Sequence, residues 1–83
     1  MMDLYFIEYE LRNERNYPKI TKELESYGAV RVLNSYWCFK RSNTSTKDLR
    51  DHFQKFIDSD DAIMVTKVTG WASSGTLSNP KKI

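Results

Sequence analysis

Residues 2–11 read MDLYFIEYEL, and this stretch decides how the rest of the chain is arranged. Strand side chains alternate between the two faces of a sheet, so the odd positions from 5 to 11 form one wholly apolar face. The even positions begin apolar, with Leu4 and Phe6, and end in the carboxylates of Glu8 and Glu10. A strand that is apolar on nearly both sides belongs in the middle of a sheet, where paired acids are rare. The two glutamates are therefore the first candidates for function.

Length and charge limit what the chain can be. Its 83 residues predict one domain, and a domain of this size buries only about 60% of its unfolded surface, so a second copy would add useful burial. Thirteen Lys and Arg against eleven Asp and Glu give a net charge of +2. This balance permits a nucleic-acid partner without requiring one.

The single cysteine and the length of the apolar runs indicate the cellular compartment in which the protein is expected. Cys38 stands alone in an apolar stretch, which excludes an internal disulfide and favours a buried thiol in a reduced setting. The start lacks the features of a secretory signal, and no apolar run approaches the ~20 residues of a membrane span. We therefore expect a cytoplasmic protein with no membrane partner.

Periodicity and turn residues predict two helices and three more strands after the first. Asn16 and Ser45 are suitable helix caps, and Gly28 is a suitable stop. The expected elements are a helix over 17–27, a hairpin of strands over 29–33 and 36–41, a helix over 46–57 and a strand over 62–69.

This order is strand, helix, strand, strand, helix, strand. Right-handed crossovers with both helices on one face give strand order 4-1-3-2, the ferredoxin-like α+β sandwich over residues 1–72. The other face then stays without helices, and an uncovered apolar face predicts contact with another chain, most simply in a homodimer. Residues 73–83 form a tail that we expect to be mobile or docked on the partner subunit.

Glu8 and Glu10 have two interpretations. Two residues apart on one strand face, their carboxylates would lie about 6–7 Å apart, and oxygen ligands of this kind suit Mg²⁺ or Mn²⁺. Alternatively, both acids form surface ion pairs with Arg12, Arg15 or Arg31. Spacing alone favours the ion pairs.

Other polar candidates are weaker. Asp58, Asp60 and Asp61 read as a turn, since they lack the glycine and distal Glu of a calcium loop. His52, the only histidine, reads as a surface residue on a helix flank. Nucleophile-elbow, glycine-rich phosphate-loop and zinc motifs are absent from the sequence, which argues against those classes of enzyme.

Basic residues in loops and at strand ends could contact a phosphate backbone. Nearby aromatics at strand spacing, Tyr9, Tyr36 and Trp37, are more typical of a core than of base stacking. The candidate nucleic-acid-binding residues are Arg12, Arg15, Lys40 and Arg41, with Lys81 and Lys82 in the tail.

Several short motifs resemble one family. The end of the first strand, Tyr9-Glu10-Leu11, the hairpin over 29–37 and the segment from Leu49 to Ala72 look like the SinR-like proteins. These are similar to the CRISPR-associated endonuclease subunit of the spacer-acquisition complex and to the VapD ribonucleases. The likeness extends over about Leu4 to Ala72.

The resemblance implies a ferredoxin-like homodimer in which an acid at the end of strand one pairs with its symmetry mate around a divalent metal and cleaves a phosphodiester. That acid is usually an aspartate in the relatives and is Glu10 here. On this hypothesis Glu10 is catalytic, Glu10 and Glu8 bind the metal, and Arg12 and Arg15 position the backbone. Two alternatives stay open: a DNA- or RNA-binding scaffold without chemistry, and a small protein-interaction module, such as an inhibitor or antitoxin-like partner.

Overall fold

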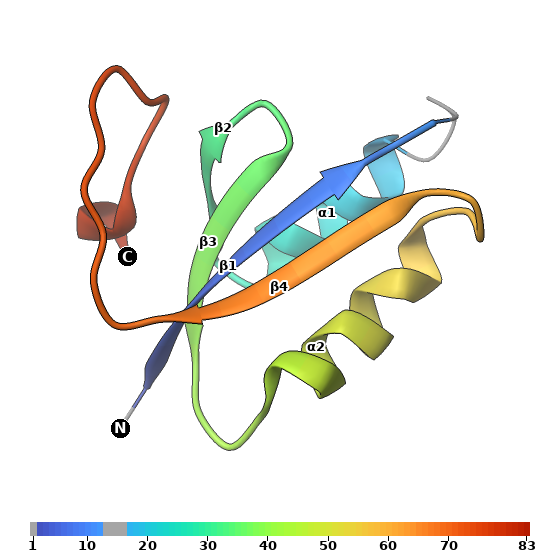
Figure 1. Ribbon diagram of the computed structural model, residues 1–83, viewed down its shortest axis with the longest axis horizontal. Coiled ribbons are helices and arrows are strands. Elements are labelled where there is room, and N and C mark those ends of the chain that lie inside the picture. The colour runs from blue at the N-terminus through green and yellow to red at the C-terminus, as the bar shows by residue number, and fades with distance from the viewer. Residues whose placement is uncertain (1, 13–16) are drawn as a thin grey trace.

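The computed structural model describes residues 2–12 and 17–83, and it has the predicted α+β architecture (Figure 1). Its four antiparallel strands stand in the order β2-β3-β1-β4, and both helices lie behind the sheet in the view of Figure 1. This is the expected ferredoxin-like order, and it places β1 between β3 and β4. The elements are β1 (Asp3–Glu10), α1 (Tyr17–Ser26), β2 (Val30–Leu33), β3 (Tyr36–Arg41), α2 (Thr46–Phe53) and β4 (Ala62–Val68).

Local signals explain where the helices begin and end. Gly28 follows α1 with φ of 71°, a conformation that glycine adopts without strain. The Ser45 hydroxyl caps α2 by accepting the Asp48 amide at 3.1 Å. The prediction of one helix to residue 57 was too long, because α2 ends at Phe53 and continues as the 3₁₀ turn η2 (Gln54–Phe56). None of the helices among the described residues could cross a bilayer.

The main core lies between the sheet and the helices. The alternation of β1 sends Tyr5, Ile7 and Tyr9 into it, where they meet side chains from β3 and both helices. The Trp37 indole donates a hydrogen bond to the Tyr9 hydroxyl at 3.1 Å. This confirms Tyr9 and Trp37 as core residues. The buried cluster comprises Tyr5, Ile7, Tyr9, Ile20, Leu24, Trp37, Phe39, Leu49 and Phe53.

His52 corrects a prediction. It is half-buried between the helices and not a lone surface residue, since its Nε2 lies 2.6 Å from a Glu23 carboxylate oxygen. Its ring also packs against Tyr27, Phe53 and Phe56. The Glu23–His52 contact therefore joins α1 to α2.

A second, smaller cluster lies on the helix-free face. Phe6, Val32 and Cys38 are buried there. The chain after β4 folds back beside this cluster: the Leu77 amide donates to the Val32 carbonyl at 2.9 Å, and Pro80, the first residue of the 3₁₀ turn η3 (Pro80–Lys82), is buried. The segment that folds back begins earlier than the predicted tail of residues 73–83, so from here on the name tail is used for residues 69–83. The tail packs along the outer edge of β2 and across part of the helix-free face (Figure 1).

Candidate functional site on the helix-free face

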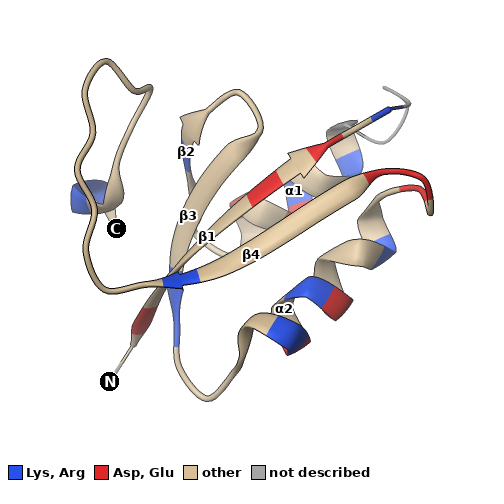
Figure 2. Ribbon diagram, in the orientation of Figure 1, with Lys and Arg blue, Asp and Glu red and all other residues tan. Residues whose placement is uncertain are grey.

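Glu8 and Glu10 both project from the helix-free side of β1, as the strand pattern predicts, and both are exposed. Figure 2 shows them in red along the central strand. Glu8 lies between Tyr36 of β3 and Met64 of β4 in the strand register. A shallow pocket of about 460 Å³ between β1 and β4 is lined by both glutamates and by Met64.

Glu10 forms an exposed ion pair with Arg12. Arg12 Nη2 lies 3.6 Å from Glu10 Oε1, and both side chains are more than half exposed. The same guanidinium donates through Nη1 to the Asp60 carbonyl at 2.5 Å. Of the two interpretations, the surface ion pair therefore holds for Glu10. The Arg12 guanidinium contacts both the Glu10 carboxylate and the Asp60 carbonyl.

The aspartate loop, residues 58–61 between η2 and β4, lies beside Glu10 and Arg12. Oxygens of Asp58, Asp60 and Asp61 lie within 4.8 Å of one another. Asp61 accepts the backbone amides of Arg12 at 2.7 Å and of Asp58 at 2.9 Å. Its carboxylate therefore closes the turn and fastens the end of β1 to the loop, in agreement with the predicted structural role.

The predicted phosphate-binding residues are dispersed. Arg41 lies on the helix side, with its guanidinium 4.0 Å from the centre of the Tyr27 ring. Lys40 is exposed and pairs in register with Leu4, at the opposite end of β1 from Arg12. Arg15 lies outside the described residues. Arg31, offered as a partner for the glutamates, instead stacks over Trp37 at 4.6 Å.

A divalent metal implied by the resemblance can be tested against these donors. The carboxylates of Glu8 and Glu10 are hard oxygen ligands, the type that Mg²⁺ prefers. In the part of the chain that is described, however, the group of three acids close enough to share an ion is the aspartate loop, not the glutamate pair. The glutamates fit the metal in chemistry, but one subunit supplies only two of them, and Glu10 already has Arg12 beside it.

Tyr36 is a site residue that sequence reasoning assigned to the core. It is half-buried on the helix-free face and its ring stacks on Phe6 at 5.1 Å between centroids. Burial, and then the negative charge of Glu8, raise the pKa of its phenol. Tyr36 thus forms an aromatic border beside the acids.

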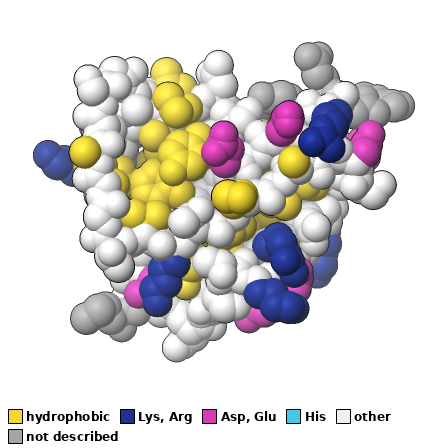
Figure 3. Space-filling view, in the orientation of Figure 1, with side chains coloured by type: hydrophobic (Ala, Val, Ile, Leu, Met, Phe, Trp, Pro, Cys, Tyr) yellow, Lys and Arg dark blue, Asp and Glu magenta, His cyan; other side chains and the backbone are white. Residues whose placement is uncertain are grey.

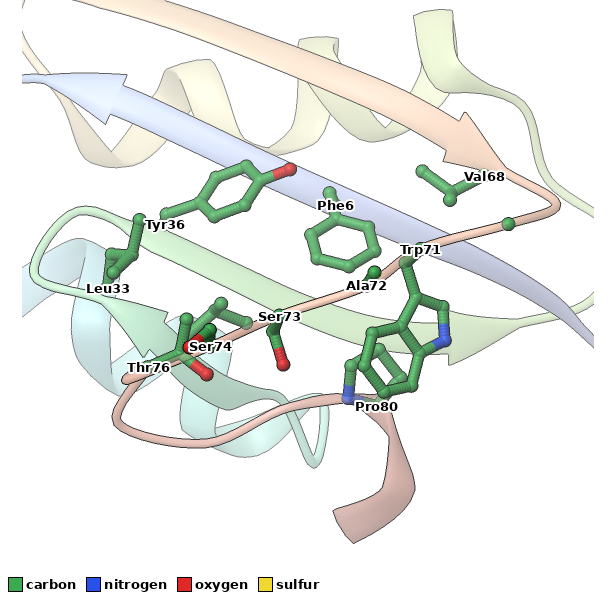
Figure 4. Close-up of a pocket in the computed structure, with 12 residues that line it drawn as sticks. Phe6, Leu33, Tyr36, Val68, Trp71, Ala72, Ser73, Ser74, Thr76 and Pro80 are labelled. Atoms are coloured by element: carbon green, nitrogen blue, oxygen red, sulfur yellow. The ribbon is translucent and has the colours of Figure 1, made fainter.

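A larger pocket under the tail was also missed. It measures about 520 Å³ and is bounded by the sheet residues Phe6 and Tyr36 and by Trp71 and Pro80 of the tail. Figure 4 shows Trp71 beside Pro80 at one end, Tyr36 at the other and Phe6 between them. The apolar residues Trp71, Leu77, Pro80 and Ile83, in a segment otherwise rich in Ser, Gly, Asn and Lys, were the available signal.

The fold and the acids at the end of β1 together define a class: small ferredoxin-like proteins with carboxylates on the helix-free face of the central strand. The sequence model of one family, CRISPR associated protein Cas2, matches residues 2–74. The chain belongs to this family, which associates it with CRISPR and with a nucleic-acid-related function.

One solved structure extends the comparison of folds. The chain is similar to the hypothetical protein TT1823 from Thermus thermophilus, with 24% sequence identity and a TM-score of 0.73. The match covers 89% of this chain and 90% of that one. At this identity the likeness shows the shared fold.

Proposed function

We propose that the protein is a homodimeric, CRISPR-associated nucleic-acid-binding protein that holds its ligand without needing a metal. The observation that carries this proposal is the separation of charge along the sheet. Glu8, Glu10 and the aspartate loop lie at the end of β1. At its start, Asp3 is paired with Lys67 at 3.4 Å, and Lys40 of β3, in register with Leu4, lies 3.4 Å from the Ile83 carbonyl oxygen, next to the tail lysines. A phosphate backbone is repelled at the first end and attracted at the second.

The helix-free face supports the dimer. Met64 of β4 is 69% exposed, and Leu33, the last residue of β2, is 49% exposed. Figure 3 shows apolar side chains beside the acids of this face. Exposed apolar surface of this kind is typical of a protein contact, and a two-fold pair is the simplest way to cover it. A closer relationship to the SinR-like and VapD-like proteins is part of the same proposal.

Engagement of Arg12 favours binding over cleavage. Arg12 is held by Glu10 and the Asp60 carbonyl, so it is not poised to position a phosphate. The ion pair between Glu10 and Arg12 would have to break before the Glu10 carboxylate could coordinate a metal ion. The family resemblance therefore supports contact with nucleic acid more directly than it supports chemistry.

A second candidate is divalent-metal-dependent phosphodiester cleavage, favoured by the exposed oxygen donors at the end of β1. Glu10, with Glu8, would hold Mg²⁺ or Mn²⁺ together with the same residues of a second subunit. The metal would supply an activated water and neutralise charge on the phosphate.

One experiment separates the two candidates. Labelled DNA and RNA are incubated with wild type and Glu10→Ala, with Mg²⁺, with Mn²⁺ and with chelator. Binding that persists in chelator and is unchanged in Glu10→Ala supports the scaffold. Cleavage that requires metal and disappears in Glu10→Ala but not in Glu25→Ala, an exposed acid of α1, establishes the nuclease and overturns metal-free binding as the main function.

A further inference from the structure

The two edges of the sheet are protected to different degrees. The edge formed by β2 is only four residues long, and its register with β3 shifts between Arg31 and Leu33. The tail lies along it, where the Leu77 amide donates to the Val32 carbonyl. A short strand, an irregular register and a covering segment are devices that prevent an edge from pairing with another chain. The β2 edge is therefore closed.

The edge formed by β4 lacks these three protections in the part of the chain that the structure describes. Its seven residues pair with β1 in unbroken register, and β4 stands last in the strand order. The strand contains no proline, and the charge of Lys67 is paired with Asp3 at 3.4 Å. The backbone N–H and C=O groups on the outer side of β4 thus offer a template for a further strand.

A groove lies between this edge and α2, which runs beside β4 in Figure 1. Its volume is about 230 Å³, and it is lined by Thr46, Lys47 and Arg50 of α2 and by Ile63, Met64 and Val65 of β4. Ile63 and Val65 are partly buried against the main core, so they form the apolar side of the groove. The Met64 side chain lies on the other face of β4, with Glu8. The groove and the proposed dimer contact are therefore on opposite sides of the strand.

The α2 side of the groove is basic. The side chains of Lys47 and Arg50 are 73% and 47% exposed. Both contact the Asp51 carboxylate, at 3.1 Å and 2.9 Å, so two cations share one acid and a positive charge is left over. A strand added to the β4 edge would place every second side chain on the helix side, beside these cations. Acidic side chains at those positions complement the groove.

We propose that the outer edge of β4 binds an extended acidic segment of a partner protein as a fifth strand, with its carboxylates beside Lys47 and Arg50. In this mode of recognition, main-chain hydrogen bonds supply affinity and the alternate side chains supply specificity. The proposal does not depend on the nucleic-acid-binding function proposed above, because it uses a different surface.

Two other occupants fit this edge less well. Antiparallel pairing of two β4 edges about a two-fold axis would bring the basic side of one α2 toward that of the other, and like charges facing each other across a contact are unfavourable. A nucleic acid could contact the cations, but it has no alternating amides and carbonyls to pair with the strand. The polypeptide uses both the edge and the groove.

The test uses capped peptides of the same length as β4 in which valine and glutamate alternate. Amide chemical shifts of the isotope-labelled protein are followed during titration. The glutamate peptide should shift the amides of β4, and a peptide with lysine in place of glutamate should bind more weakly. N-methylation of the glutamates or of the valines should abolish binding in one case and spare it in the other, because alternate amides of a strand point to opposite sides.

Lys47→Glu with Arg50→Glu should lower the affinity for the glutamate peptide roughly fivefold, as expected for two exposed ion pairs. The same variant should bind the lysine peptide more tightly than the wild type does. The matched control is Lys19→Glu with Lys22→Glu, which changes two exposed lysines of α1 and should leave both affinities unchanged.

Three results would overturn the proposal. The first is a glutamate peptide that leaves the β4 amides unshifted, or that binds no better than the lysine peptide. The second is a set of β4 shifts that depend on protein concentration without peptide, which would assign the edge to a second copy. The third is an oligonucleotide that shifts the β4 amides where the glutamate peptide does not. Loss of oligonucleotide binding by the wild type would refute the proposed function and leave the β4 edge untouched.

Discussion

Glu10 and Arg12, two residues apart at the end of β1, form an ion pair with 3.6 Å between Oε1 and Nη2. Because Arg12 also donates to the Asp60 carbonyl, the pair links the central strand to the aspartate loop. The acid that the resemblance singles out for a metal is thus the one that has a cation beside it.

The first prediction concerns how much the contacts of Glu10 and of Asp61 at the end of β1 contribute to the free energy of unfolding. Glu10→Ala should change the free energy of unfolding by no more than about 1 kcal/mol, since exposed ion pairs contribute little. Asp61→Ala should cost about 1–3 kcal/mol, because it deprives two backbone amides of their acceptor. Urea denaturation of both variants measures the difference. Equal losses in the two would contradict the structural role of Asp61.

The second prediction concerns the polar contact in the core. Tyr9→Phe removes the acceptor of the Trp37 indole and leaves that N–H buried without a partner. The expected cost is about 1–3 kcal/mol. Tyr36→Phe is the matched control, since Tyr36 is only half-buried, and it should cost less. A larger loss in the control would show that the Tyr9–Trp37 bond is not important for stability.

The third prediction concerns Cys38. Burial raises the pKa of its thiol from 9.0 to about 11, so alkylation of the native protein should be slow at pH 8 and fast only after unfolding. Above pH 9 the unfolded chain loses this proton while the folded chain keeps it. The folded state therefore binds more protons, and its stability should fall as pH rises from about 9 to 11.

Cys38→Ala supplies the control for this pH dependence, once its own loss of core packing is subtracted. The variant should show a shallower decline in the free energy of unfolding over the same range. Rapid alkylation of the native wild type at pH 8 would be inconsistent with the buried thiol.

The fourth prediction concerns the dimer. Met64→Glu introduces a charge on the exposed apolar border of the helix-free face, beside Glu8 in the strand register. Repulsion and loss of apolar contact should shift the protein from dimer to monomer, as measured by sedimentation. Lys55→Glu, an exposed change in η2 on the helix layer, should leave the assembly intact. A wild type that sediments as a monomer would refute the proposed assembly.

The sequence predicts the fold well because its local signals agree with one another. The alternation of β1, the Ser45 cap and Gly28 each specify an element on their own, and their order leaves few topologies. The end of α2 was misplaced, since Phe56 and Ile57 continue the apolar spacing although the backbone has already tightened into a 3₁₀ turn.

The candidate site was less predictable, because it depends on contacts distant in sequence. Lys40 and Arg41 are neighbours on β3 and point to opposite faces, so Arg41 stacks on Tyr27 beneath the helices while Lys40 is exposed. His52 contacts Glu23, which lies 29 positions earlier in the sequence. The pocket under the tail requires Trp71 and Pro80 to return to Phe6, and the irregular spacing of the tail does not reveal that return.

Binding of a labelled oligonucleotide across a range of salt concentrations, in the presence of chelator, tests the central claim most directly. We predict measurable binding without metal and a linear fall of log K with log salt concentration, as expected when lysines displace counterions from phosphates. Absence of binding in chelator with recovery on adding Mg²⁺, or an affinity that does not respond to salt, would contradict the account.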